Sequence, residues 1–155
     1  MGTGSGIQAV FAAERASFVV ATDINPAACE CAKINAIING VYSKMDIRLG
    51  DLFEPISMGE KFDLIIFSPP YLPGEPRDLL ERSWMCGSEH EVIRRFFKDA
   101  AKYLSEDGRI RMVYSTIADT DVLLQILENY NWDWKVAARK RHLLEEIFVL
   151  EVTPR

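Results

Sequence analysis

The sequence contains few of the residues from which metal sites and disulfide frameworks are built. Its 155 residues include three cysteines and two histidines. Three cysteines at irregular spacing exclude a disulfide framework and a zinc site, so we expect reduced thiols and no bound metal. No apolar run approaches the ~20 residues that a membrane-spanning helix needs, and no signal peptide opens the chain. We therefore expect a cytoplasmic protein without membrane contact.

The sequence also lacks an excess of positive charge. It has 18 Lys and Arg against 23 Asp and Glu, a formal net charge of −5. Proteins that bind nucleic acid nonspecifically need cations to neutralise phosphates, so nucleic acid is the less expected partner. One basic cluster, residues 139–142, breaks this pattern. We interpret it as a solvated turn, or as an edge strand protected by charge.

Apolar runs and helical patterns alternate along the chain, without repeats or linker-like stretches. This order predicts an α/β fold, with a Rossmann-like, doubly wound and mostly parallel sheet that ends in an antiparallel hairpin. The expected strands are Ser17–Ile24, Met45–Asp51, Phe62–Phe67, Gly108–Ser115, Trp132–Arg141 and Glu145–Val152. The expected helices are Ile7–Arg15, Pro26–Asn39, Glu89–Leu104 and Thr120–Tyr130. The length suits a single domain over residues 1–155.

One expected strand is missing from this order. A glycine loop of the kind found at the start of the chain normally follows a strand that lies centrally in a doubly wound sheet. Here the loop begins at Gly2. We therefore expect either an N-terminally truncated domain, or another segment in the place of the first strand.

The glycine loop is the first candidate binding element. Gly2, Gly4 and Gly6 allow tight turns and bring backbone amides close to a ligand at a helix N-terminus. A dinucleotide fingerprint would need glycine at position 7, where the sequence has Ile7. The compact spacing therefore favours a nucleoside ligand without a pyrophosphate.

Two aspartates at strand ends are the next candidates. Asp23 ends the first expected strand, where a carboxylate can accept both ribose hydroxyls. A role for Asp23 as a helix cap is less needed, because Asn25 already offers one. Asp51 ends the following strand, within reach of an adenine amine, although an aspartate after glycine is also a common turn residue.

The stretch Ser68-Pro69-Pro70-Tyr71 follows the expected strand Phe62–Phe67, whose apolar run predicts a fully buried strand. Proline cannot donate a ladder hydrogen bond, so the strand must end there. The two prolines also fix the backbone, which holds the Ser68 hydroxyl and the Pro69 carbonyl as acceptors, while Tyr71 offers a flat ring. These groups suit a planar target that carries an NH2 group. The alternative is that the prolines only end a strand.

These motifs resemble the class I S-adenosylmethionine-dependent methyltransferases. The tetrapeptide (N/D/S)-P-P-(Y/F/W) marks the members that methylate amino groups. Within this class the sequence is similar to the HemK/PrmC family of release-factor glutamine methyltransferases, in particular to its short archaeal and eukaryotic branch. The segments that carry this similarity are Thr22–Pro26, Asp51–Glu54, Glu81–Gly87 and Glu91–Phe97.

The resemblance implies S-adenosylmethionine as methyl donor and S-adenosylhomocysteine as product. It implies that a cofactor site is formed by Gly2, Thr3, Gly4, Gly6, Asp23, Ile24, Asp51 and Leu52. It also implies that Ser68, Pro69, Pro70 and Tyr71 hold the target amide. The family's substrate is the glutamine of the Gly-Gly-Gln motif in peptide-chain release factors, and a small activating partner subunit is sometimes required.

Two alternatives remain at this point. One is methylation of an adenine or guanine amine in RNA or DNA, and the other is an inactive or partner-binding methyltransferase-like domain. Family members usually carry Asn where this chain has Ser68, whose shorter hydroxyl needs a water to reach the target. We interpret His90 and His142 as surface residues, and we expect Trp84 and Met85 to cover the substrate.

Overall fold

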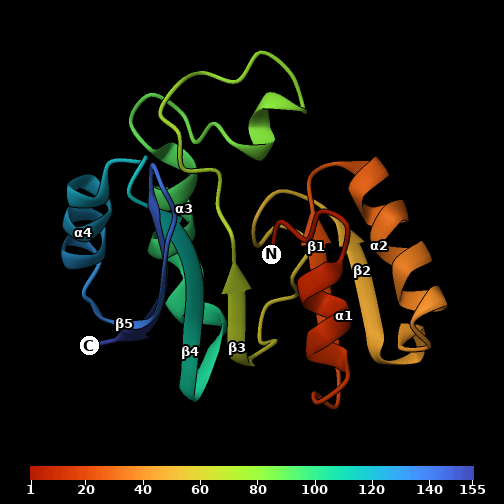
Figure 1. Ribbon diagram of the computed structural model, residues 1–155. Coiled ribbons are helices and arrows are strands. Elements are labelled where there is room, and N and C mark those ends of the chain that lie inside the picture. The colour runs from red at the N-terminus through yellow and green to blue at the C-terminus, as the bar shows by residue number, and fades with distance from the viewer. The chain divides into compact units, whose positions relative to one another are not determined.

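The computed structural model describes residues 1–155 and divides into two compact units, unit 1 (residues 1–58) and unit 2 (residues 59–155) (Figure 1). Unit 1 contains α1 (Ile7–Ala13), β1 (Val19–Asp23), α2 (Pro26–Ile38), a 3₁₀ turn (Tyr42–Lys44) and β2 (Met45–Leu49). Unit 2 contains β3 (Phe62–Phe67), 3₁₀ turns at Glu81–Ser83 and Ala100–Tyr103, α3 (Glu91–Asp99), β4 (Leu104–Ser115), α4 (Thr120–Asn129), β5 (Trp132–Arg141) and β6 (Glu146–Pro154).

Unit 1 is a βαβ arrangement with a parallel strand pair. Val19 lies opposite Met45 and Asp23 lies opposite Leu49, so both strands end at the same edge. The crossover helix α2 makes this parallel connection possible. The core beneath the helices consists mainly of small side chains, with Ala9, Val10, Ala13, Ala21, Ala36 and Met45 buried together.

Local chemistry fixes both ends of α2. The Asn25 side chain accepts a hydrogen bond from the Ala27 amide at 2.9 Å, and Pro26 occupies the first helical position. Both residues are favoured there, because the first amides of a helix have no partner within the helix. The helix ends at Ile38, and Gly40 follows with a φ of 69°. The sequence prediction for this helix is confirmed.

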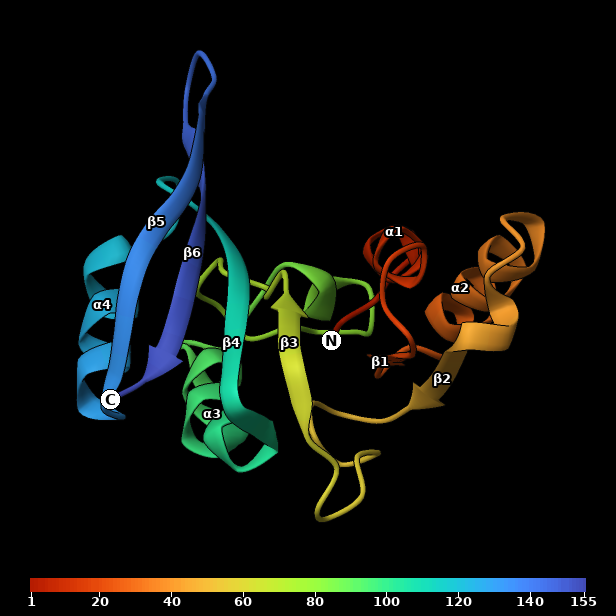
Figure 2. The ribbon, with the colours of Figure 1, turned by 90° about the horizontal axis from the view of Figure 1, so that it is seen from below.

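Unit 2 contains a four-stranded sheet in the order β3-β4-β6-β5. β3 and β4 are parallel, whereas β6 runs antiparallel to both of its neighbours. Helices α3 and α4 pack against the sheet, and Figure 2 shows them beside its strands. The Phe67 and Phe96 rings lie 4.2 Å apart between their centroids, and the Trp132 indole donates to the Phe97 carbonyl at 3.1 Å.

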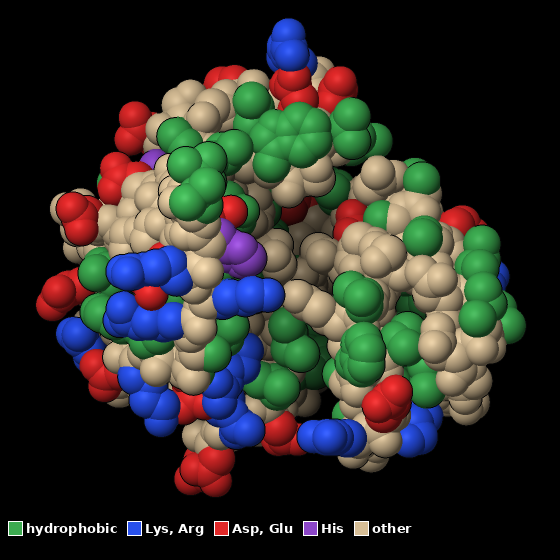
Figure 3. All heavy atoms as spheres, in the orientation of Figure 1, with side chains coloured by type: hydrophobic (Ala, Val, Ile, Leu, Met, Phe, Trp, Pro, Cys, Tyr) green, Lys and Arg blue, Asp and Glu red, His purple; other side chains and the backbone are tan.

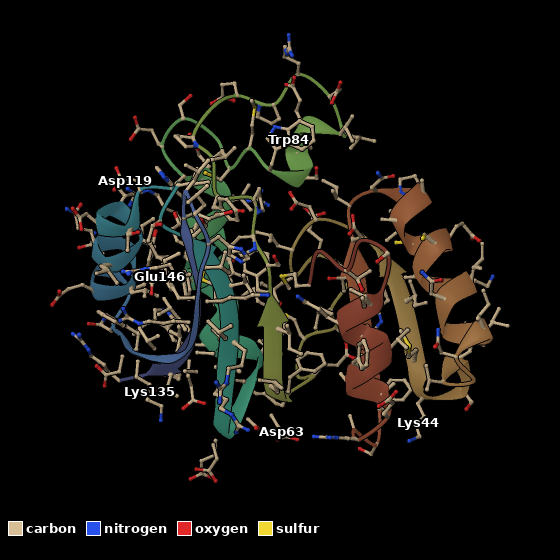
Figure 4. All side chains as sticks on the ribbon, viewed as in Figure 1. Lys44, Asp63, Trp84, Asp119, Lys135 and Glu146 are labelled. Carbon is tan, nitrogen blue, oxygen red and sulfur yellow. The ribbon has the colours of Figure 1, made fainter.

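The strand β3 differs from the prediction of a fully buried strand. Ile65 and Phe67 are buried, whereas Asp63 and Leu64 are exposed. Alternate side chains of a strand point to opposite faces, so Leu64 lies on the face opposite to Phe67, whose ring packs on Phe96 of α3. Asp63 lies at the start of β3 and accepts a hydrogen bond from the Ser105 hydroxyl at 2.8 Å (Figure 4).

The α/β class of the fold is confirmed, with the predicted parallel pairs and the predicted antiparallel hairpin at the end of the chain. The strands lie in a two-stranded and a four-stranded sheet, one in each unit. The assignment of residues 1–155 to a single domain stays a prediction. No helix of the structure combines the length and the apolar character needed to cross a membrane.

Candidate functional site

The glycine loop of unit 1 has the backbone conformation that its residues favour. Gly2, Gly4 and Gly6 have φ angles of 60°, 55° and 82°. A Cβ atom on Gly6 would lie 2.8 Å from Ala32, so α1 and α2 approach too closely there for any side chain. A Cβ atom on Gly4 would meet nothing within 4 Å. Gly6 is therefore needed for packing, whereas the open space beside Gly4 is available to a ligand.

Asp23 connects this loop to the end of β1. Its Oδ2 accepts a hydrogen bond from the Gly4 amide at 2.8 Å, and its Oδ1 accepts one from the Asn25 amide at 2.9 Å. The side chain is half-buried. A carboxylate has about four lone-pair sites, so each oxygen keeps an acceptor position after these bonds. Two neighbouring acceptors of this kind suit the two hydroxyls of a ribose.

The turn after β2 lies next to Asp23. The Gly50 amide donates to the Asp23 carbonyl at 2.9 Å, which brings Asp51 to the edge where β1 ends. Leu52 follows with a φ of 48°. A branched residue rarely adopts this left-handed conformation, and such strain is concentrated at functional sites. Unit 1 therefore brings the glycine loop, Asp23 with Ile24, and Asp51 with Leu52 to one edge.

The tetrapeptide of unit 2 follows β3 as predicted. Ser68 is exposed, and no hydrogen bond connects its hydroxyl to the rest of the protein. Pro69 is buried, and Pro70 and Tyr71 are half-buried. The Tyr71 ring meets the Tyr114 ring edge to face, with centroids 5.6 Å apart. The corner thus combines an available hydroxyl with a ring that is held in place.

Tyr114 forms part of a buried row behind this corner. Its ring also lies 6.0 Å from the Phe148 ring, and its hydroxyl donates to the Asp119 carbonyl at 3.4 Å. Burial raises the pKa of the Tyr114 phenol far above its usual range, so the group stays neutral. The residue therefore supports the corner by packing rather than by proton transfer.

Residues 72–90 form an irregular loop that is closed by its own bonds. Leu72 bridges to Met85 and Gly74 bridges to Gly87. The Cys86 thiol is buried and donates to the Leu72 carbonyl at 3.3 Å. Burial raises the pKa of Cys86 to about 11, so this thiol is not a ready nucleophile.

An ion pair orders the outer part of the same loop. The Arg77 amide and Nε each donate to the Glu81 carboxylate at 2.8 Å, and Nη2 is a third donor. The hydrogen bond from Arg77 lowers the pKa of Glu81. Figure 4 shows Trp84 on this loop. Its side chain is only partly buried, at 38% exposed, so its predicted role of covering a substrate stays a prediction.

His90 corrects the interpretation of both histidines as surface residues. It is 6% exposed, has a φ of 58°, and its Nε2 atom has no hydrogen-bond partner. The polar stretch around it, with Ser88 and Glu89 before it, gave no sign of burial. His142 is exposed, as predicted.

A glycine loop and two strand-end aspartates at one edge of a βαβ unit are typical of Rossmann-like proteins that bind a nucleoside. The chain belongs to the methyltransferase small domain family, whose model matches residues 1–141. It is an S-adenosylmethionine-dependent methyltransferase of class I.

Individual relatives agree with the resemblance to the HemK/PrmC family. A Methanocaldococcus jannaschii protein named as a protein N5-glutamine methyltransferase is 29% identical over 97% of this chain and 77% of its own length. The human methyltransferase HEMK2 is also 29% identical, over 99% of this chain and 75% of its own length. The family prediction is confirmed.

One solved structure shows the same fold. The Mtq2–Trm112 complex of E. cuniculi, described as responsible for methylation of the termination factor eRF1, matches 99% of this chain and 81% of the solved chain. The TM-score is 0.71 and the identity is 22%. At 22% identity, this similarity shows only that the two chains share a fold.

Proposed function

We propose that this enzyme methylates the side-chain amide nitrogen of a glutamine in a peptide-chain release factor. The name of the Methanocaldococcus jannaschii relative supports glutamine methylation, and the E. cuniculi complex supports a termination factor as substrate. The observation that carries the proposal is the corner after β3. There the Ser68 hydroxyl is exposed and free of internal hydrogen bonds, beside a Tyr71 ring that packs on Tyr114.

The chemistry of an amide nitrogen explains why such a corner is useful. Its lone pair is delocalised into the carbonyl, so the nitrogen is a poor nucleophile. S-adenosylmethionine, when bound, supplies a strongly electrophilic methyl group, and the protein therefore needs no strong base. The Pro69 carbonyl accepts a hydrogen bond from the NH2 group directly, and the Ser68 hydroxyl accepts one through a bridging water. These bonds strengthen as the nitrogen becomes positive, which favours the transition state over the ground state.

We further propose that the edge of unit 1 holds the cofactor. Gly2, Thr3, Gly4 and Gly6 line its methionine and ribose end. Asp23 accepts hydrogen bonds from the ribose hydroxyls, Ile24 packs beside the adenine, and Asp51 with Leu52 binds the adenine. The remaining acceptor positions of Asp23 and the open space beside Gly4 support this assignment.

A small activating partner subunit is part of the proposal. The E. cuniculi relative was solved as a complex with Trm112. In this chain, unit 1 exposes several large apolar side chains, namely Ile34, Ile37, Ile38, Tyr42 and Leu49. A group of exposed apolar residues is typical of a protein–protein contact. We also propose a cytoplasmic place of action, because that is where release factors function.

Mass spectrometry of a release factor after incubation with the enzyme and S-adenosylmethionine tests the proposal. We expect one added methyl group on the glutamine of the Gly-Gly-Gln motif. A release factor with that glutamine replaced by glutamate is the control, and it should remain unmodified. Methylation of RNA or DNA in place of the protein would refute the proposal.

A further inference from the structure

The turn between β5 and β6 forms a projecting tip on unit 2. We use the name hairpin tip for residues 139–146. Figure 2 shows it extending beyond the helices of unit 2. The His142 amide donates to the Glu145 carbonyl at 2.8 Å and closes the turn, so Leu143 and Leu144 occupy its two central positions. These leucines are 98% and 88% exposed.

Two leucines are unusual residues for the centre of a turn. Gly, Asn, Asp and Pro dominate such positions because their backbone or side chains favour the turn geometry. Leu143 and Leu144 gain nothing from burial in this chain, because almost all of their surface faces solvent. Single exposed apolar residues are common, but an adjacent pair at a projecting tip is typical of a contact surface for another molecule.

The charges of the hairpin tip are only partly neutralised within the chain. Glu146 pairs with Arg139 at 3.7 Å, and Glu145 accepts a hydrogen bond from the Ser115 hydroxyl. Lys140 and Arg141 are exposed and have no carboxylate within ion-pair distance. The tip therefore presents two available cations beside two exposed leucines.

A second group of cations on unit 2 is already paired with a carboxylate, unlike Lys140 and Arg141. Figure 3 shows blue side chains gathered on the part of the surface that belongs to unit 2. Arg109, Arg111 and Lys135 all pair with Glu151, at 3.6, 2.5 and 2.7 Å. Since one carboxylate already orders these side chains, and no exposed apolar pair lies among them, the hairpin tip is the better candidate for a docking surface.

The topology of the sheet places the hairpin tip at the same edge of the sheet as the tetrapeptide corner. β5 is antiparallel to β6 and β6 is antiparallel to β4, so β5 ends at the same edge as β3 and β4. The Thr116 amide donates to the Glu146 carbonyl at 3.0 Å, which joins the base of the tip to the end of β4. The rings of Tyr71, Tyr114 and Phe148 link the corner to β6.

We infer that the hairpin tip docks the protein substrate, through a segment in which carboxylates flank an apolar side chain, at a distance from the modified glutamine. This inference rests on the proposed function. The tip favours a protein over a nucleic acid, because its exposed apolar side chains are the two leucines and it carries no Phe, Tyr or Trp ring as a platform for base stacking. Leu143 and Leu144 would also make no favourable contact with a charged phosphate backbone.

Steady-state kinetics on two substrates test the inference. The substrates are an intact release factor and a short peptide that contains only the Gly-Gly-Gln motif and its immediate neighbours. Two variants alter the tip, the double substitutions Lys140→Glu/Arg141→Glu and Leu143→Ser/Leu144→Ser. The variant Lys33→Glu/Lys98→Glu is the matched control, because it changes the net charge equally at two exposed lysines that are not part of the tip.

We expect each tip variant to raise KM for the intact release factor with little change in kcat. The charge variant should raise it about tenfold, the effect expected when two exposed ion pairs are replaced by repulsion. The increase in KM should shrink at high salt for this variant, because salt screens exposed charges. Kinetic constants for the short peptide should not change, and the control should behave like the unmodified enzyme.

Several outcomes would overturn the inference. One is an equal effect on peptide and intact protein, and another is an equal effect of the control variant. Displacement of the release factor by RNA from the unmodified enzyme, but not from the charge variant, would assign the tip to a nucleic acid. Failure of the unmodified enzyme to methylate either substrate would refute the proposed function, and the inference with it. Circular dichroism of all variants confirms that they are folded.

Discussion

Tyr71 meets Tyr114 edge to face, with 5.6 Å between the ring centroids. Tyr71 follows the two prolines that end β3, whereas Tyr114 is buried near the end of β4. An aromatic pair of this geometry contributes about 1 kcal/mol beyond the burial of its surface. The contact therefore fixes the orientation of the half-buried ring at the end of the tetrapeptide.

The first prediction concerns the ring of Tyr71. If it positions a planar target, Tyr71→Ala should lower kcat about 10- to 100-fold, since a misplaced target loses much of the benefit of orientation. Tyr71→Phe keeps the ring and the contact with Tyr114, and it should retain most of the activity. Phe18→Ala, at an exposed aromatic residue directly before β1, is the control. An unchanged kcat for Tyr71→Ala would contradict the assignment.

The second prediction compares two glycines with similar backbones. Gly4 and Gly40 have φ angles of 55° and 69°, and a Cβ atom on either would meet nothing within 4 Å. Alanine at either position should therefore cost a similar ~1 kcal/mol of stability, the penalty of a left-handed conformation. Only Gly4→Ala should weaken S-adenosylmethionine binding, because its methyl group occupies the space that we assign to the cofactor.

Isothermal titration calorimetry with S-adenosylmethionine, together with thermal unfolding, separates these effects. We expect Gly40→Ala to bind the cofactor like the unmodified enzyme despite a lower Tm. Gly6→Ala is a third case, because its Cβ atom would lie 2.8 Å from Ala32 and should reduce stability more than either. Equal cofactor affinities for the Gly4 and Gly40 variants would remove Gly4 from the proposed site.

The third prediction concerns Asp23, which accepts hydrogen bonds from the amides of Gly4 and Asn25. Asp23→Asn replaces one acceptor oxygen by an NH2 group that faces an amide donor. Stability should fall by about 1–3 kcal/mol, the cost of an unsatisfied donor. Cofactor affinity should fall as well, because one of the two acceptors for the ribose hydroxyls is lost.

Asp46→Asn provides the comparison for this variant. Asp46 is a strand carboxylate of unit 1 that pairs with Arg48 at 2.8 Å, away from the glycine loop. Its replacement should leave S-adenosylmethionine affinity unchanged in a calorimetric titration. If Asp23→Asn loses stability but binds the cofactor normally, the carboxylate is a structural link between loop and strand, and the ribose assignment is wrong.

Local chemistry made part of this fold predictable from the sequence. Asn25, Pro26 and Gly40 delimit α2 because each satisfies a backbone requirement within a few residues of itself. The apolar content of the strands likewise predicted the β5–β6 pair. The place of Asp23 at a strand end followed from the same pattern, but its bond to Gly4 did not, since it joins residues 19 positions apart.

Other features depend on packing partners that a linear pattern does not reveal. The apolar run of β3 predicted burial on both faces, yet Leu64 is 40% exposed while Phe67 packs on α3. His90 lies in a polar stretch and is nevertheless buried. The loop over residues 72–90 has no periodicity, so the bridge between Leu72 and Met85 could not be inferred.

The last prediction concerns the pH dependence of that loop. The hydrogen bond from Arg77 holds the pKa of Glu81 below its usual value of 4.5 in the folded chain. The unfolded chain then binds a proton more readily, so this pair stabilises the fold above the usual pKa and stops doing so as pH falls through the lowered value. Glu81→Gln should reduce the free energy of urea-induced unfolding at neutral pH, and the difference from the unmodified chain should disappear in acid.

Glu106→Gln, at an exposed carboxylate without an ion pair, is the control, and its free energy of unfolding should differ from that of the unmodified chain by the same amount at neutral and at acid pH. A difference for Glu81→Gln that persists in acid would mean that shape, rather than charge, makes Glu81 important to the loop.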